Sequence, residues 1–197
     1  DVHTTGVAAH GATPERGENA ISKMARLVAV LDGEFRDLLV EAGGPDDWLG
    51  QSTINVGMIH GGTRSNIVPD ACRLRVDIRT TPGLQRHGGA LALLRDFVAR
   101  RDPGAGVTVF SEAMPLDTDC NHPLVHKLVS CGAALTGAPW FCDAAFLAAA
   151  GTPSVAIGPG SIAQAHTKDE FIRIDDLKNG VAFFRSFLQS LRTLQVA

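Results

Sequence analysis

The chain has 197 residues, 45% of them hydrophobic and 20% charged, and its formal net charge is −3. This composition suits a folded protein of one large domain or two small ones, and the charge gives no electrostatic basis for binding nucleic acid or an anionic membrane. No apolar run approaches the ~20 residues of a membrane-spanning helix, so we expect no membrane partner. The four cysteines form no C-x-x-C pair, which favours reduced thiols in a cytoplasmic protein.

The first half of the chain has the pattern of a small α+β domain. Val and Thr content predicts a strand over residues 1–9, and apolar residues at helical spacing predict a helix within 13–39. Two alternating strands follow at 52–60 and 72–80, with Ile54, Val56 and Met58 on one face. A second helix over 84–101 and a strand over 106–112 complete the order β-α-β-β-α-β. That order predicts a ferredoxin-like sandwich over residues 1–112.

The second half, residues 113–197, has a different pattern, in which helices alternate with a short apolar strand. Asn121 and Pro123 predict the start of a helix that runs to Gly137, and residues 139–151 predict a turn and a short helix. The apolar run at 153–157 is typical of a buried parallel strand, and 174–194 form an amphipathic helix. About two strands do not make a stable sheet. Because the chain also opens directly in a strand at Asp1, we expect it to be part of a longer protein.

The stretch "GPGSIAQAHTKDEF", residues 158–171, raises the question of what His166 does. It fits a G-x-G-x-x-A dinucleotide fingerprint, but no helix or further strand follows as that motif requires. A solvated loop histidine and a metal ligand are the other two interpretations. The loop follows a predicted strand, where α/β sheets place ligand sites, and carboxylates follow at once to accept the second imidazole N–H. One histidine alone is not a zinc site.

Three blocks of the chain, in order, resemble the zinc-dependent amidohydrolase and peptidase family. This family includes acetylornithine deacetylase, succinyl-diaminopimelate desuccinylase, aminoacylase and carboxypeptidase G. Residues 8–21, "AAHGATPERGENAI", are similar to the histidine block that starts the family's lid, or dimerisation, domain. Residues 53–83 are similar to the lid's central hairpin, and 141–172 to the return into the catalytic domain. The "GPGSIAQAH" block is most similar to the acetylornithine deacetylase branch, which implies a place in arginine biosynthesis.

The resemblance implies a fold and a set of site residues. The fold is an α+β ferredoxin-like lid over 1–112, followed by the C-terminal part of an α/β metallopeptidase catalytic domain over 113–197. His166 matches the last metal ligand, and His10 the lid histidine that reaches the partner's active site in a homodimer. There His10 donates to the oxyanion formed when metal-bound hydroxide attacks the amide carbonyl. The remaining matches are substrate-binding positions: Asn66, Arg79, Asp143, Gly158, Pro159 and Gly160.

The implied activity is hydrolysis of an N-acyl amino acid, with two zinc ions, or cobalt, in each active site. The family's first metal ligands, its bridging aspartate and its glutamate base match nothing in this sequence. We therefore expect the 197-residue chain alone to be inactive and to bind zinc weakly or not at all. The alternative is a non-catalytic homodimerisation module that pairs through the edge of the ferredoxin-like sheet. His60, His87, His122 and His126 match no functional block.

Overall fold

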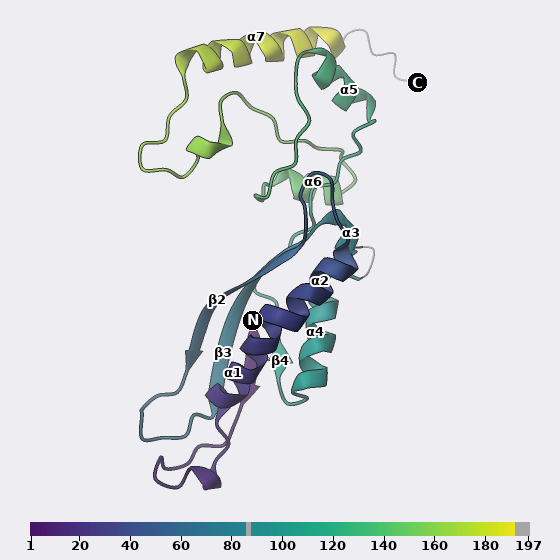
Figure 1. Cartoon of the computed structure of the whole chain (residues 1–197). Helices are drawn as coiled ribbons and strands as arrows, with labels where there is room; N and C mark the ends of the chain where they lie inside the picture. The colour runs from purple at the N-terminus through teal and green to yellow at the C-terminus, as the bar shows by residue number, and fades with distance from the viewer. Residues whose placement is uncertain (86–87, 192–197) are drawn as a thin grey trace. The chain divides into compact units, whose positions relative to one another are not determined.

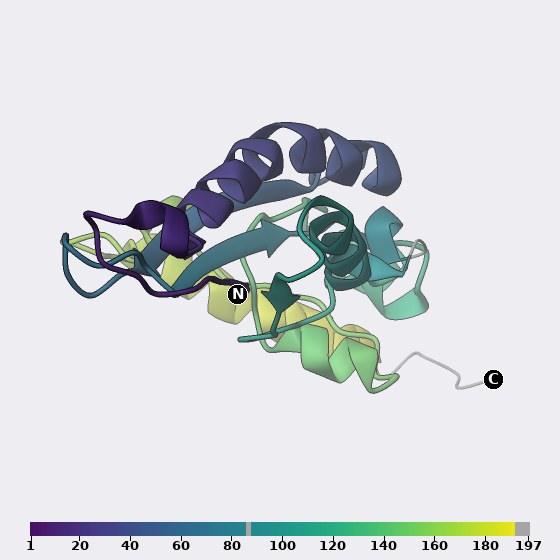
Figure 2. The same ribbon diagram turned by 90° about the horizontal axis from the view of Figure 1, so that it is seen from below.

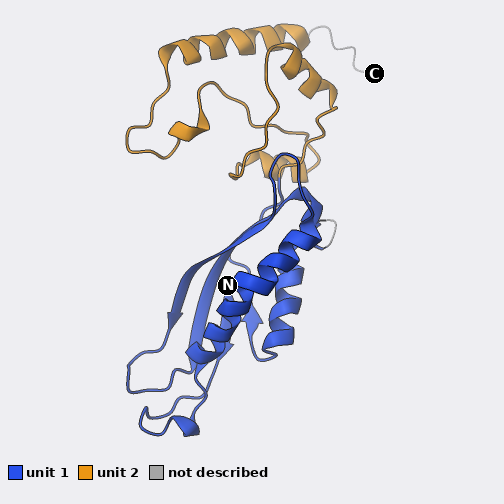
Figure 3. Cartoon of the chain, viewed as in Figure 1, with its two compact units in different colours: residues 1–115 blue, residues 116–197 orange. Residues whose placement is uncertain are grey.

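The computed structural model describes residues 1–85 and 88–191, so His87 lies outside the described residues. The chain divides into two compact units, residues 1–115 and 116–197 (Figure 3). No helix among the described residues is both long and apolar enough to cross a membrane.

The first unit is built on a four-stranded antiparallel sheet. Its strands are β1 (Val2–Thr5), β2 (Thr53–Gly61), β3 (Ala71–Arg79) and β4 (Gly106–Val107), in the order β2-β3-β1-β4 (Figure 1). The first and third strands of the sequence lie in the middle, and the second and fourth lie at the edges. This is the arrangement expected from the β-α-β-β-α-β order, and it confirms the predicted ferredoxin-like fold.

The helices of this unit lie together on one face of the sheet (Figures 1 and 2). They are α1 (Ala20–Val30), the π-helical turn η2 (Leu31–Phe35), α2 (Arg36–Gly43), α3 (Pro82–Gln85) and α4 (Gly89–Arg101). The Asn19 side chain caps α1 by accepting a hydrogen bond from Ser22 N at 3.0 Å. Residues 14–16 form a separate 3-10 turn, η1 (Pro14–Arg16). Positive φ angles at Gly88 and Gly89 separate α3 from α4 within the single helix that was predicted.

The core lies between these helices and the sheet. It contains apolar residues from one side of α1, η2 and α2, from the inner side of α4, and from the inward faces of β1 and β3. The rings of Phe35 and Phe97 meet with centroids 5.2 Å apart. Burial of this kind, at about 25 cal/mol per Å² of apolar surface, is the main force that holds the unit together. The fully buried core side chains include Val2, Met24, Leu31, Phe35, Leu39, Leu74 and Leu84.

The predicted face of Met58 is wrong. The register of β2 against β3 shifts between Val56 and Met58, so that Met58 pairs with Arg75 and remains 50% exposed. A bulge of this kind moves every following side chain to the other face of the sheet. The fourth strand is also shorter than predicted, because only Gly106 and Val107 are strand residues.

The second unit contains α5 (Pro123–Ser130), α6 (Ala144–Ala149), a 3-10 turn η3 (Ile162–Gln164) and α7 (Ile174–Leu191). The predicted cap of α5 was wrong, because the His122 side chain, not Asn121, accepts the hydrogen bond from Leu124 N. The helix also ends at Ser130, well before Gly137.

The predicted parallel strand at residues 153–157 was also wrong. No strand occurs in the described part of the second unit, and Val155 and Ile157 are 40% and 42% exposed. A strand is completed by a neighbour that accepts its backbone hydrogen bonds, and these residues have no such neighbour within their unit. The α7 helix is present from Ile174 to Leu191, and the rest of the predicted helix, 192–194, lies outside the described residues. Leu177, Val181 and Leu188 on its apolar side are more than half exposed.

Candidate functional site

Two of the predicted site residues of the first unit, His10 and Asn66, lie on neighbouring segments. His10 forms an isolated antiparallel bridge with Ile67, and Gly11 N donates to the backbone oxygen of Asn66 at 2.8 Å. One segment follows β1 and the other connects β2 to β3. The sheet brings them together because β1 pairs with β3, with Thr5 opposite Ala71. Both His10 and Asn66 are exposed.

The ring orientation of His10 is fixed by its own loop. Its Nδ1 accepts a hydrogen bond from Ala12 N at 3.0 Å, and its backbone oxygen accepts one from Thr13 N at 2.9 Å. A ring nitrogen that accepts a backbone N–H carries no proton, so neutral His10 carries its proton on Nε2. The side chain therefore presents an N–H donor away from its loop.

Arg79 lies at the other end of the same sheet. It is the last residue of β3 and pairs with Thr53 at the start of β2. Since β3 has nine residues, its two ends lie about 26 Å apart. The Arg79 guanidinium forms an ion pair with Asp77 at 2.7 Å, and both side chains are at least half exposed. Within one copy of the unit, Arg79 is therefore separate from His10 and Asn66.

The second unit holds the remaining predicted residues. Pro159 packs against α7, because a methyl group on Gly180 would lie only 2.9 Å from its ring carbons. Gly160 has φ 89°, a conformation that only glycine adopts without strain, and the Ile172 side chain lies beside it. Gly158 begins this bend, and Asp143 is an exposed residue just before α6.

His166 has an unusual backbone. Its φ is 60°, in the left-handed region, and it is the one non-glycine residue with positive φ in the part of the chain that the structure describes. Glu170 accepts a hydrogen bond from the backbone N of His166 at 3.0 Å. The sequence pattern predicts that a carboxylate at this place accepts the imidazole N–H, whereas Glu170 accepts the backbone N–H. Strained backbone of this kind costs about 1–3 kcal/mol and is concentrated at functional sites.

The described residues do not form a complete metal centre. Across residues 1–85 and 88–191, no three His, Cys, Asp or Glu side chains are grouped so that they could hold a metal ion. Zinc takes three or four protein ligands, and His166 would supply one of them. The described residues therefore do not fit a two-zinc site by themselves.

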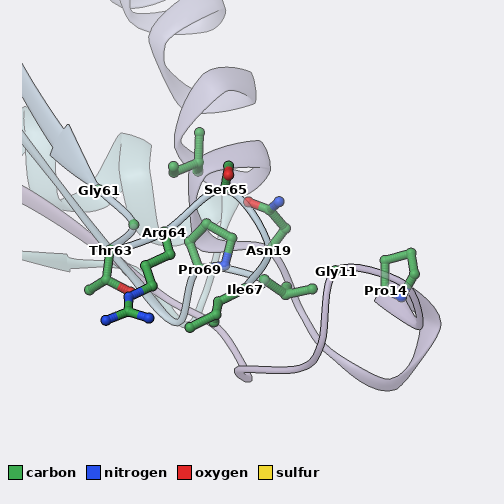
Figure 4. A pocket seen from close by; sticks show the side chains of 12 residues that line it. Gly11, Pro14, Asn19, Gly61, Thr63, Arg64, Ser65, Ile67 and Pro69 are labelled. Atoms are coloured by element: carbon green, nitrogen blue, oxygen red, sulfur yellow. The ribbon is translucent and has the colours of Figure 1, made fainter.

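A pocket missed by the sequence analysis lies beside the His10–Asn66 segments. Its volume is about 560 Å³, and it is lined by residues from the start of α1 and from the β2–β3 connection. Figure 4 shows Thr63 and Arg64 at one side, and Gly11 and Pro14 at the other. The signal in the sequence was the pair of glycines at 61–62. A Cβ on Gly61 would lie 2.9 Å from Ile21 and from Cys72, so this backbone runs close against α1.

Comparison with known proteins identifies the chain's relatives. A family model described as the M20 peptidase dimerisation domain matches residues 1–104. The acetylornithine deacetylase of Klebsiella pneumoniae is 34% identical over 184 residues, which cover 90% of this chain and 47% of that protein. The acetylornithine deacetylase of Vibrio vulnificus is 31% identical over 180 residues, or 88% of this chain and 47% of that protein. The chain therefore spans about half the length of these relatives.

Solved structures show the same fold at lower identity. The aminopeptidase PepT of Bacillus cereus is 21% identical with a TM-score of 0.72, covering 98% of this chain and 51% of that one. An M20 family metallo-carboxypeptidase of Sulfolobus solfataricus is 14% identical with a TM-score of 0.63, covering 95% of this chain and 61% of that one. The relatives named in both comparisons are hydrolases. By the match over residues 1–104 and the agreement of fold, the chain belongs to the M20 peptidase dimerisation domain family.

Proposed function

We propose that this chain is the C-terminal half of an amide hydrolase that cleaves an N-acyl amino acid into a carboxylate and a free amine. The observation that carries the proposal is that the segments of His10 and Asn66 are bridged, with His10 Nδ1 accepting from Ala12 N so that Nε2 remains to donate. An exposed N–H donor on a fixed loop is suited to an oxyanion that develops on an amide carbonyl. The names of the acetylornithine deacetylase relatives support the same reaction class.

A homodimer would complete this site. The sheet has two edges, and β2 at nine residues is far longer than β4 at two. If β2 pairs with its copy across a two-fold axis, the two strands run antiparallel. The Gly61 end of one copy, which leads to Asn66, then lies near the Thr53 end of the other, where Arg79 is its cross-strand partner. His10 and Asn66 of one copy would thus meet Arg79 of the second.

Each side chain has a separate task in this composite site. The Arg79 guanidinium binds the carboxylate of the amino acid by two parallel hydrogen bonds, after exchanging its present partner Asp77. Asn66 supplies an amide to a neighbouring polar atom of the substrate. His10 donates Nε2–H to the carbonyl oxygen as negative charge develops there. We assign Asp143 and the bend at residues 158–160 to the substrate-facing part of the catalytic domain.

Residues 113–197 would belong to that catalytic domain. This assignment is supported by the exposed apolar side of α7, because no described residue buries Leu177, Val181 and Leu188. The other zinc or cobalt ligands and the general base would lie in the half of the relatives' length that this chain does not span. His166, held in a strained backbone, would be the one ligand from this half.

The alternative is a homodimerisation module without chemistry. It is favoured by the same β2 edge and by the dimerisation-domain match over residues 1–104. The four free cysteines support a cytoplasmic location under either proposal.

The test begins with the coding DNA upstream of the Asp1 codon. The longest open frame is expressed, and hydrolysis of N-acetylornithine and of other N-acetyl amino acids is measured with and without a chelator. The hydrolase proposal expects chelator-sensitive turnover that falls by about 10²–10³ in the His10→Gln variant, while the control His126→Gln, at an exposed position of α5, keeps it. An in-frame stop just before Asp1, or a stable dimer without turnover, would favour the dimerisation module.

A further inference from the structure

The pocket beside His10 and Asn66 is rich in hydrogen-bond donors. The Asn19 side-chain oxygen already accepts from Ser22 N at 3.0 Å, so its NH₂ group remains to donate. Thr63 and Ser65 add hydroxyl groups, and Arg64 adds a guanidinium (Figure 4). Its apolar wall includes Ile21, Ile67 and Val68. A small molecule with one polar, anionic end and an apolar body fits such a lining.

The charge in this pocket is not balanced. None of its twelve lining residues carries a carboxylate. None of the ion pairs found among the described residues involves Arg64. The nearby lysine differs, because Lys23 Nζ pairs with Glu18 at 2.7 Å, and that contact lowers the pKa of the Glu18 carboxyl. Arg64 is therefore a guanidinium in an exposed pocket that holds no negative charge.

The N-terminus of α1 adds to this field. Asn19 and Ile21, at the start of the 11-residue helix, both line the pocket. The partial positive charge of a helix N-terminus favours an anion within its first turn. It acts in the same direction as the Arg64 charge.

We propose that this pocket binds a carboxylate through Arg64, and that it selects N-acyl amino acids carrying a second carboxylate in the side chain or the acyl group. The selection rests on the proposed function, since only a composite site in a dimer places the pocket next to a bound substrate. Carboxylate binding itself rests on the pocket alone. Arg79 of the second copy would hold the α-carboxylate, and Arg64 the second one.

The chemistry also predicts what the pocket rejects. A substrate with a cationic side chain, such as N-acetylornithine, would bring an ammonium group toward an unpaired guanidinium. Like charges in one pocket repel each other, whereas a carboxylate gains a fork of two charge-assisted hydrogen bonds. The preferred substrate class thus differs in charge from that named for the acetylornithine deacetylase relatives.

The experiment is a binding titration on the 197-residue chain, which needs neither metal nor turnover. N-acetylglutamate and N-acetylornithine are added to ¹⁵N-labelled protein, and backbone amide shifts are followed by NMR. We expect N-acetylglutamate to shift signals of residues 61–69 saturably, with a Kd at least about fivefold tighter than that for N-acetylornithine. Arg64→Gln should raise the Kd for N-acetylglutamate at least about fivefold. Arg64→Lys should raise it by less, because lysine keeps the positive charge but cannot form two parallel hydrogen bonds to a carboxylate.

Arg26→Gln is the matched control, since Arg26 is an exposed arginine of α1 outside the pocket. It should bind N-acetylglutamate as the parent chain does. Equal binding of the two ligands, unchanged binding by Arg64→Gln, or shifts of residues 61–69 that depend only on protein concentration would overturn the proposal. The last result would mean that a second copy occupies the pocket. None of these results bears on His10, so failure here is distinct from failure of the hydrolase proposal.

Discussion

Gly11 N donates to the backbone oxygen of Asn66 at 2.8 Å, and this bond joins the two segments that carry the proposed oxyanion donor and its neighbour. The approach is close, because a Cβ on Gly11 would lie 3.1 Å from the carbonyl carbon and oxygen of Asn66. The spacing of His10 and Asn66 therefore depends on a glycine at position 11.

Gly11→Ala should separate these segments. Because the added methyl group would press on the backbone of Asn66 and not on a flexible side chain, we expect the free energy of unfolding to fall by about 1 kcal/mol, measured by urea denaturation. Gly33→Ala is the matched control, because nothing lies within 4 Å of its added methyl group and the residue is in a helical turn. That variant should be unchanged or more stable by about 0.5–1 kcal/mol. Equal stabilities for the two variants would show that the contact at Gly11 is unimportant.

Ile59→Glu should weaken the proposed homodimer. Ile59 is a half-exposed residue of the β2 edge, and a two-fold axis would bring the same residue from each copy into one interface. A carboxylate added to each copy along the paired β2 edges raises the dimer dissociation constant, and we expect at least a roughly tenfold rise in sedimentation equilibrium, or about 1.4 kcal/mol.

Val109→Glu controls for the added charge, because Val109 is also about half exposed and follows β4 at the opposite edge of the sheet. The dimer dissociation constant of this variant should equal that of the parent chain. If Val109→Glu separates the copies and Ile59→Glu does not, the dimer forms through the β4 edge instead.

Cys72 should react more slowly than Cys120 with iodoacetamide. Burial raises the pKa of the Cys72 thiol, so the reactive thiolate forms at higher pH than usual. Cys120 is exposed and provides the internal comparison. We expect at least roughly tenfold slower labelling of Cys72 at neutral pH, measured by mass spectrometry of the labelled peptides. Comparable rates at neutral pH would mean that the Cys72 side chain is open to solvent.

The same shift has a consequence for stability. The unfolded chain loses the Cys72 proton first as pH rises past the ordinary thiol range of about 8.5. The folded state then binds more protons than the unfolded state, so the Cys72 contribution to stability is complete below that pH and falls above it. The Cys72→Ala variant should lose this alkaline dependence in urea titrations at several pH values.

His166→Gly should not lower the stability of the second unit. The positive φ of His166 costs an L-residue about 1–3 kcal/mol, and glycine adopts this conformation without that cost. His166→Val, with a branched Cβ, should lose about that amount relative to His166→Gly. Trp140 lies in the second unit, so its fluorescence in a Trp48→Phe background reports this unfolding. Equal stability of the Gly and Val variants would mean that this φ is not held in solution.

Local patterns in the sequence predicted much of the first unit. The spacing of Met24, Leu27 and Leu31 predicted the buried side of α1 and of the turn that follows it, and the order of the elements predicted the strand order. Such patterns report which face of an element is apolar. They do not report a bulge, and so Met58 was assigned to the wrong face.

Other features depend on parts of the chain that are distant in sequence. Residues 153–157 have a strand's composition, but a strand also needs a neighbour, and composition does not reveal whether one is present. The family resemblance selected His10 and Asn66, but only the pairing of β1 with β3 explains why they are neighbours. The sequence did not single out Arg64, because a local pattern cannot reveal that no carboxylate lines the pocket around it.

The buried residues Leu27, Leu31, Phe35 and Leu39 recur every four positions through α1, η2 and α2. On a straight α-helix each step of four would turn the stripe by about 40°, and Leu39 would leave the core. The wider π turn at Leu31–Phe35 absorbs this drift and keeps all four residues against the sheet. Substitution of an exposed residue leaves this alignment of buried residues in place, whereas a change in the length of the segment does not. Deleting a single residue within 31–35 would rotate one half against the other by about 100° and turn a core face toward water.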